Sequence, residues 1–240
     1  MNRALYAAAS GMAAQQRNMD VVADNLANAD VVGFKSATAT FTTLGADAQL
    51  GTAFAGGRTS FAQGKLERSG GPFDVAIDGA GFFAVERDGE IAYTRAGAFS
   101  RSADGRLRNA AGWALRGIRI PADAVSVTVA ADGRVNLESP SHGRREADRL
   151  RLTAFAAPEL LRPAGTALFA ATQGSGPPRE LPAGGDRQSK IVFGSLEKSN
   201  VSIVESMMAI LAAQRAYEAN AKGVQASDEM LRIANNLHRS

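Results

Sequence analysis

The sequence predicts an α+β fold: N- and C-terminal α-helices that pack as a coiled-coil domain, plus a central antiparallel all-β domain. An apolar repeat near each end, and short glycine-punctuated strand patterns between them, predict this arrangement. Both repeats have a period of 3.5 residues, which keeps one stripe of a helix against a partner helix. We expect residues 1–35 and 200–240 to form the helical domain, 36–71 an extended connector and 72–199 the β-domain.

The N-terminal helix is expected over about residues 3–28. Its alanine-rich sequence has a high helix propensity, and the Asn, Asp and Gly residues between Asn28 and Gly33 supply stop signals. Its apolar stripe consists of Leu5, Ala8, Met12, Gln15, Met19, Val22 and Leu26.

The C-terminal helix is expected to begin near Ser202, which forms a capping-box pattern with Glu205, and to extend to about Leu237. Its stripe consists of Ile203, Met207, Ile210, Gln214, Tyr217, Ala221, Val224, Asp228, Leu231 and Asn235. The polar members of the two stripes either fix the register of helix packing or face solvent or a lumen. These members are Gln15, Gln214, Asp228 and Asn235.

The two connecting segments lack periodicity. Gly, Thr and Ser dominate residues 36–71, and Pro and Gly interrupt residues 174–188, so we expect an extended or loosely structured connector and a second loop.

The middle of the chain carries strand signals. Residues 74–78 alternate with period two, and residues 82–85 resume the pattern after a Gly-Ala-Gly break. Asp-Gly pairs at 88–89, 104–105 and 132–133 are each flanked by strand-like residues, which is typical of tight hairpins. Val125, Val127 and Val129 alternate before the last pair, a helical turn fits residues 158–168, and a last strand is expected around 191–193. These signals predict an antiparallel meander or sandwich.

Composition excludes several classes of protein. With 240 residues the chain can form one sizeable core or two modest ones, and its net charge of +3 is too small for a typical nucleic-acid binder. It contains no cysteine, hence no disulfide framework. No stretch is long and apolar enough to span a membrane, and the N-terminus lacks the apolar core of a cleavable signal peptide.

Catalytic and cofactor sites are not expected. The Gly79-x-Gly81 pattern resembles a dinucleotide fingerprint, which requires a following helix, but residues 82–85 continue as strand. Asp74 and Asp78 lie on the same side of a predicted strand, where turn chemistry explains them better than acid–base catalysis.

Other isolated signals have ordinary explanations. The two histidines, His142 and His238, are far apart and lack clustered partners, so we expect no metal site. The arginines at 144, 145, 149 and 151 have no interleaved aromatic residues, which favours a solvated loop. The glycosylation-like Asn200-Val201-Ser202 is better explained as a helix cap.

The helical ends and the strands carry a family resemblance. Residues 20–28 (DVVADNLAN) and 33–35 (GFK) resemble the N-terminal signature of bacterial flagellar axial proteins, the rod and hook subunits, with Asp24 and Val31 departing from the usual pattern. Residues 194–201 (GSLEKSNV), 213–220 (AQRAYEAN) and 228–231 (DEML) resemble the C-terminal signature. Residues 74–77, 81–83 and 93–99 (YTRAGAF) resemble the shared β-domain.

The resemblance implies a structural subunit of the basal-body rod, not an enzyme, that polymerises through its terminal helices into a hollow, torque-transmitting helical shaft. The motifs at 11–16 and 213–218 favour a distal-rod subunit, whereas the short connector is nearer to the proximal-rod type. A non-flagellar adaptor is the alternative from another class. The implied partners are further copies, other rod and hook proteins, the surrounding ring bushing and the type III export apparatus, with no nucleic acid and no membrane insertion.

The resemblance also implies a location and an interface. The rod would span the periplasm, and the subunit would be exported by a route that leaves its N-terminus intact. Its terminal helices would fold only on assembly. We expect an assembly interface from the N-terminal helix and motif (Leu5, Met12, Met19, Val22, Asn25, Leu26, Asn28, Gly33, Phe34) and from the C-terminal helix (Ile203, Met207, Ile210, Gln214, Arg215, Tyr217, Val224, Met230, Leu231).

Overall fold

The computed structural model describes residues 3–44, 51–140, 143–181, 183–184 and 189–237. The chain forms two compact units. The first, which we call the helical unit, consists of residues 1–29, 36–60 and 201–240. The second, the β-unit, consists of residues 30–35 and 61–200. The α+β class predicted from the sequence is confirmed.

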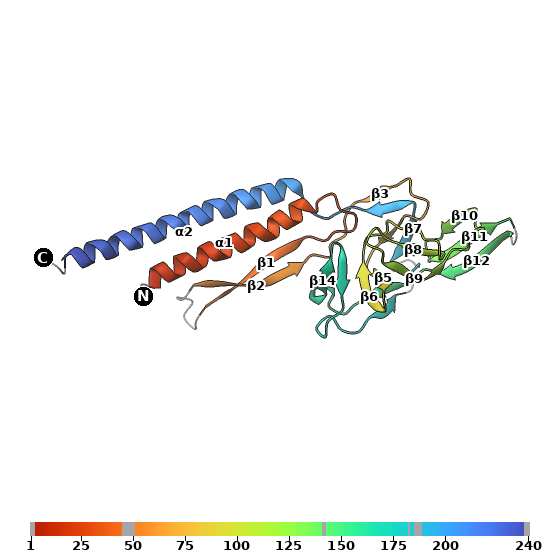
Figure 1. Cartoon of the computed structure of the whole chain (residues 1–240), viewed down its shortest axis with the longest axis horizontal. Coiled ribbons are helices and arrows are strands. Elements are labelled where there is room, and N and C mark those ends of the chain that lie inside the picture. Colours follow the sequence, from red (N-terminus) through yellow and green to blue (C-terminus); the bar gives the residue numbers. More distant parts are fainter. Residues whose placement is uncertain (1–2, 45–50, 141–142, 182, 185–188, 238–240) are drawn as a thin grey trace. The chain divides into compact units, whose positions relative to one another are not determined.

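The helical unit contains two antiparallel helices, α1 (Arg3–Ala27) and α2 (Ile203–Leu237), which lie side by side (Figure 1). Both were predicted within one residue of these bounds. At the start of α2, the hydroxyl of Ser202 accepts a hydrogen bond from the backbone N–H of Glu205 at 3.3 Å, as the capping pattern predicts. Neither helix in the described part of the chain combines the length and apolar character needed to cross a membrane.

Residues 36–60 differ from the expected loose connector. They contain an antiparallel pair, β1 (Ala37–Thr43) and β2 (Thr52–Thr59), that packs along α1. The pairing register shifts between Thr40 and Phe41 of β1. Gly56, which pairs with Thr40 from β2, has a φ of +138° there. The helix supports these strands, so they form without an alternating apolar pattern of their own. Residues 45–50 of the expected connector lie outside the described residues.

The β-unit is antiparallel throughout its described strand pairs. Its largest sheet has the order β14-β15-β6-β5-β9-β8-β7, and β13 pairs with both β5 and β16. Smaller sheets have the orders β10-β11-β12, β17-β4 and β18-β3. The strands are β3 (Leu66–Arg68), β4 (Val75–Asp78), β5 (Phe82–Arg87), β6 (Glu90–Thr94), β7 (Ser100–Arg101), β8 (Arg106–Arg108), β9 (Ala114–Arg119), β10 (Ser126–Val129), β11 (Arg134–Ser139), β12 (Gly143–Arg149), β13 (Leu152–Ala154), β14 (Arg162–Gly165), β15 (Leu168–Ala170), β16 (Arg179–Leu181), β17 (Lys190–Phe193) and β18 (Ser195–Glu197).

All three Asp-Gly pairs lie in hairpin turns, which connect β5 to β6, β7 to β8 and β10 to β11. The strand predicted around residues 191–193 is β17, but it is not the last one, because β18 follows it and pairs with β3. Two further details differ from the sequence-based expectation. Only Pro158–Leu160 forms a helical turn, since Pro163 and Gly165 lie in strand β14. Strand β16 lies within the second expected loop, where it pairs with β13.

One main core fills the β-unit. It includes Val75, Ile77, Phe83 and the single tryptophan, Trp113, which is 6% exposed. Ala76 on the opposite face of β4 is also buried, so this strand is covered on both faces and its alternation does not mark a solvent side. A second cluster contains Phe82, Tyr93, Leu161 and Phe169. Its three aromatic rings make edge-to-face contacts with Phe61 and Phe155.

Candidate functional site

Small side chains form the contact between α1 and α2. A Cβ atom added at Gly11 would lie 2.8 Å from the Asn220 side chain, and one at Gly223 would lie 3.8 Å from the Cβ of Ala8. Among the described side chains of α2, the buried ones are Ser206, Ala213 and Ser227, at spacings of seven and fourteen residues, with Asn220 midway in the longer gap. Because this stripe is made of small residues, the helices approach closely and bury little apolar surface.

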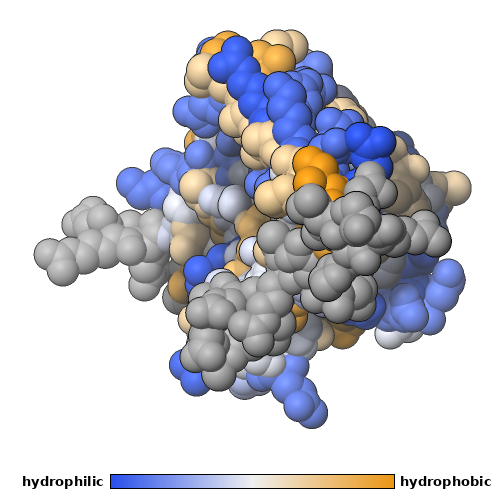
Figure 2. Space-filling view, turned by 90° about the vertical axis from the view of Figure 1, so that its left-hand side faces the viewer, coloured by the Kyte–Doolittle hydropathy of each residue, from blue (hydrophilic) through white to orange (hydrophobic). Residues whose placement is uncertain are grey.

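The large apolar side chains of α2 point elsewhere. Ile203, Val204, Met207, Met208 and Leu211 are all 45–67% exposed. Val204, Met208 and Leu211 lie on the side of the helix opposite the buried stripe, and Ile203 and Met207 lie between this side and the stripe. A second group near the end of α2 consists of Met230, Leu231 and Ile233, which are 42–59% exposed. Figure 2 looks at the side of the molecule that carries the chain ends and shows hydrophobic groups separated by hydrophilic side chains. Several large apolar side chains that stay exposed together on one helix are typical of an interaction site.

The residues predicted for the interface therefore fall into three sets. Exposed are Ile203, Met207, Gln214, Arg215, Tyr217, Met230 and Leu231. Half-buried are Leu5, Met12, Met19, Val22, Leu26, Asn28, Ile210 and Val224. Buried within the single chain are Asn25, Gly33 and Phe34. The exposed apolar residues Val204, Met208, Leu211 and Ile233 were not predicted, because they do not occupy positions of the 3.5-residue repeat.

Asn25 and Gly33 have roles inside the chain. The Asn25 side-chain amide donates to the Ala37 carbonyl at 2.7 Å and accepts from the Ala37 N–H at 2.8 Å, which ties α1 to the start of β1. The N–H of Gly33 donates to the Glu197 carbonyl at 2.7 Å. Gly33 has a φ of +68°, and a Cβ there would lie 2.3 Å from the Ala96 nitrogen, so only glycine fits.

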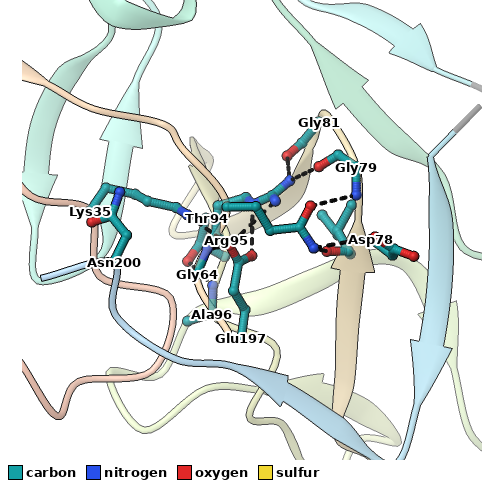
Figure 3. Close-up of polar contacts among 12 residues, drawn as sticks. Lys35, Gly64, Asp78, Gly79, Gly81, Thr94, Arg95, Ala96, Glu197 and Asn200 are labelled. Atoms are coloured by element: carbon teal, nitrogen blue, oxygen red, sulfur yellow. Dashed lines mark hydrogen bonds and ion pairs between the residues drawn. The ribbon is translucent and has the colours of Figure 1, made fainter. Parts of the chain in front are cut away.

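A buried ion cluster lies in the β-unit (Figure 3). The Lys35 ammonium donates to Oε1 of Glu197 at 2.7 Å, and Nε of Arg95 donates to Oε2 of the same carboxylate at 2.9 Å. The Lys35 and Glu197 side chains are 0% exposed and that of Arg95 is 4% exposed. Two cations thus share one anion, so the cluster carries one excess positive charge.

Backbone groups satisfy the rest of the cluster. Lys35 also donates to the Ala62 carbonyl at 2.6 Å, and the N–H of Gly64 donates to Glu197 at 2.9 Å. Arg95 donates to the carbonyls of Gly79 and Gly81 at 2.9 and 2.7 Å. Burial lowers the pKa of the Lys35 ammonium from its usual value, an effect that the hydrogen bond and charge of Glu197 oppose.

The cluster connects the positions where the chain passes between its two units. Lys35 ends one β-unit segment, and Ala62 lies one residue inside the next. Asn200, the last residue of that segment, donates from its side chain to the same Ala62 carbonyl at 3.0 Å. Lys35, Arg95 and Glu197 lie in the motifs at 33–35, 93–99 and 194–201, but single charged residues give no sequence signal that they meet.

The alternative sites have structural explanations. Asp74 accepts a hydrogen bond from the Ser69 hydroxyl at 2.6 Å, and Asp78 accepts one from Gln63 at 3.3 Å. Strand β5 follows the Gly79-x-Gly81 pattern, as predicted. His142 and His238 lie outside the described residues, as does the side chain of Asn235. Within the described residues, no group of three or more His, Asp or Glu side chains is placed to hold a metal ion.

Helices paired through small residues, with large apolar residues left outside, define a structural protein that assembles with other chains. Comparison with known protein families gives three matches in the corresponding order. The flagella basal body rod protein family matches residues 5–35, the flagellar hook protein FlgE/F/G D1 domain matches 76–137, and the flagellar basal body rod FlgEFG protein C-terminal family matches 194–237.

Similar proteins cover the whole chain. The flagellar basal-body rod protein FlgG of Borreliella burgdorferi is 37% identical over 100% of both chains. FlgG of Agrobacterium fabrum is 36% identical over 96% of this chain and 97% of its own. The rod protein FlgF of Caulobacter vibrioides is 32% identical over 98% of this chain and 97% of its own. The chain belongs to the flagellar basal-body rod protein family, whose members are structural proteins and not enzymes.

Proposed function

We propose that the chain is a FlgG-type subunit of the distal rod, which polymerises through its terminal helices into a hollow, torque-transmitting shaft. The full-length similarity to FlgG proteins favours the distal over the proximal rod. The observation that carries the assembly mechanism is the exposed apolar face of α2, made of Ile203, Val204, Met207, Met208 and Leu211.

The energetics favour burial of this face between subunits. Each large apolar side chain removed from water contributes about 1.5 to 3 kcal/mol. Because these side chains are still 45–67% exposed in the single chain, about half of that contribution remains available to a neighbouring helix. Head-to-tail contacts that repeat without closing produce a helical polymer.

The half-buried residues of α1, among them Met12, Met19 and Leu26, would support the same helical layer.

We further propose that the ends become fully ordered on assembly, since their large apolar residues lack cover in the single chain. Equal protease resistance of both ends in the isolated subunit and in the rod would contradict this. As a subunit of the rod, the chain is also proposed to span the periplasm, to pass through the flagellar export apparatus and to contact a surrounding ring.

Leu211→Asp tests the assembly face. Leu211 is 57% exposed, so the substitution leaves the single chain intact but places a charge in a desolvated contact. Lys222→Asp is the matched control, because it introduces the same side chain at an exposed, already charged position of α2. We expect Leu211→Asp, but not Lys222→Asp, to remove the protein from isolated basal bodies. Normal incorporation of both variants would overturn the proposal.

Leu231→Asp is a second test of the same kind, since Leu231 is 42% exposed. Leu26→Asp is a less specific test of assembly. Leu26 is half-buried in the single chain, so a charge there would disturb the chain itself as well as its contacts.

A further inference from the structure

The β-unit has an open cleft where strands diverge from β5. One edge of β5 pairs with β13 through Phe82 and Phe83, and with β9 through Val85 and Glu86. Gly117 in β9 has a φ of +81°. It follows the last residue of β9 that pairs with β5, and beyond this point β13 is the strand that pairs with this edge of β5. The divergence leaves a cleft of about 470 Å³ above Ala84.

Arginines dominate the lining of this cleft. Arg116, Arg149, Arg151 and Arg179 line it, against the two carboxylates of Asp148 and Glu180. Within the lining, four guanidinium groups therefore face two carboxylates, while Glu86 and Asp132, which also pair with two of these arginines, lie outside it.

The guanidinium groups of the cleft are accessible. The side chains of Arg116, Arg149 and Arg151 are 50%, 53% and 66% exposed, respectively. Their contacts to Glu86, Asp132 and Glu180 are 3.4, 3.4 and 3.1 Å. Such exposed ion pairs are weak, so the arginines can exchange partners at little cost. Guanidinium groups bind carboxylates in preference to neutral groups.

An acidic turn on the same unit complements the cleft. The hairpin between β5 and β6 has Asp88 and Glu90 at its tip, and the Asp88 side chain is 93% exposed. Asp88 has a φ of +52°, and its one described ion pair is a 4.0 Å contact with the neighbouring Arg87. The turn thus presents two carboxylates beside the single positive charge of Arg87, so its net charge is negative and opposite in sign to that of the cleft lining.

We propose that the arginine cleft of one subunit receives the Asp88–Glu90 turn of a second copy. The inference rests on the proposed polymerisation and adds a β-unit contact to the contact between helices. If each contact uses one cleft and one turn, the two copies keep a free turn and a free cleft, so the contact can repeat head-to-tail as a polymer requires. Charge pairs of this kind set orientation and register more than overall affinity.

Disulfide cross-linking tests the contact directly, since the chain has no cysteine of its own. A chain carrying Asp88→Cys and Arg179→Cys is expressed in flagellated cells, and isolated basal bodies are oxidised. We expect a ladder of cross-linked subunits on a non-reducing gel. The control carries Asp88→Cys and Arg162→Cys, because Arg162 is also exposed but lies in β14, outside the cleft lining. A bond within one chain produces no ladder.

Charge reversal gives a second readout. Arg116→Glu with Arg179→Glu, or Asp88→Lys with Glu90→Lys, should each lower incorporation about tenfold or more, and the four changes together should restore it. If the Asp88→Cys, Arg179→Cys chain enters the rod but forms no ladder, or if the control forms a ladder of equal strength, this inference alone is overturned. Absence of the wild-type chain from basal bodies would instead overturn the proposed rod function.

Discussion

Lys35 and Glu197 are 162 residues apart in the sequence, yet their side chains form a fully buried ion pair at 2.7 Å. The pair joins the N-terminal Gly-Phe-Lys motif to the Leu-Glu-Lys motif that precedes α2. Arg95, from the Tyr-Thr-Arg motif of the β-unit, binds the same carboxylate. Three motifs of the family thus converge on one cluster, which fixes the β-unit where the chain enters and leaves it.

Glu197→Gln should destabilise the β-unit strongly. It removes the only anion of the cluster and leaves two buried cations without a counter-charge, which costs about 3 to 5 kcal/mol. Lys35→Met should cost less, because Arg95 and Glu197 remain as a neutral pair. Fluorescence of the single Trp113 during denaturant unfolding measures both. An equal or larger loss for Lys35→Met would contradict the assigned charge balance.

Glu67→Gln is the surface control for this experiment. Glu67 pairs with Lys65 at 3.0 Å, but the two side chains are 41% and 78% exposed. Solvent screens such a pair, so the unfolding midpoint should hardly change. A shift as large as that of Glu197→Gln would show that burial is not what makes the cluster important.

Gly33→Ala should be far more harmful than Gly194→Ala. Both glycines have a φ of +68°, so the left-handed backbone should destabilise the alanine variant by the same amount, about 1 to 2 kcal/mol, at each position. At Gly33 the new Cβ would also meet the Ala96 backbone at 2.3 Å, whereas nothing lies within 4 Å at Gly194. Unfolding midpoints of the two variants measure the difference. Similar midpoints would mean that residues 30–35 repack freely.

Asp104 should make part of the stability sensitive to acid. Hydrogen bonds from the Arg108 side chain and the Arg106 N–H lower the pKa of Asp104 from 3.8 to about 2. A carboxylate whose pKa is lower in the folded than in the unfolded chain stabilises the fold at any pH above its unfolded pKa. This stabilisation is lost as the pH falls from about 4 to about 2. Asp104→Asn should therefore be less stable than wild type at pH 7 and approach it near pH 2. A difference independent of pH would contradict this.

Removal of residues 1–28 or 205–240 should abolish incorporation and leave the β-unit folded. Both segments belong to the helical unit, whereas the main core and Trp113 belong to the β-unit. Fractionation of basal bodies and a cooperative Trp113 unfolding transition measure the two outcomes. A truncated chain that still enters the rod would refute the role of the helices.

Much of the fold follows from local sequence signals. The two helices, the Asp-Gly hairpins and strand β17 were predicted because periodicity, caps and turn dipeptides act over a few residues. The β1–β2 hairpin was not, since its strands are supported by α1, which lies outside any local window. Val125 shows the same difficulty: it continues an alternating pattern but lies before β10 and is 75% exposed.

The site was predictable only in part. The heptad stripes identify the helices used in contacts, but not which side faces the same chain. The buried stripe of α2 consists of Ser206, Ala213 and Ser227, and the stripe expected from large residues is mostly exposed. The ion cluster was not predictable, because nothing local to Lys35, Arg95 or Glu197 indicates that the folded chain brings them together.

A density map of the assembled basal body tests the central claim most directly. We predict that the chain occupies the distal level of the rod and that Val204, Met208 and Leu211 of α2 are buried against helices of neighbouring subunits. A map in which this face of α2 is open to solvent, with no neighbouring helix against it, would contradict the account.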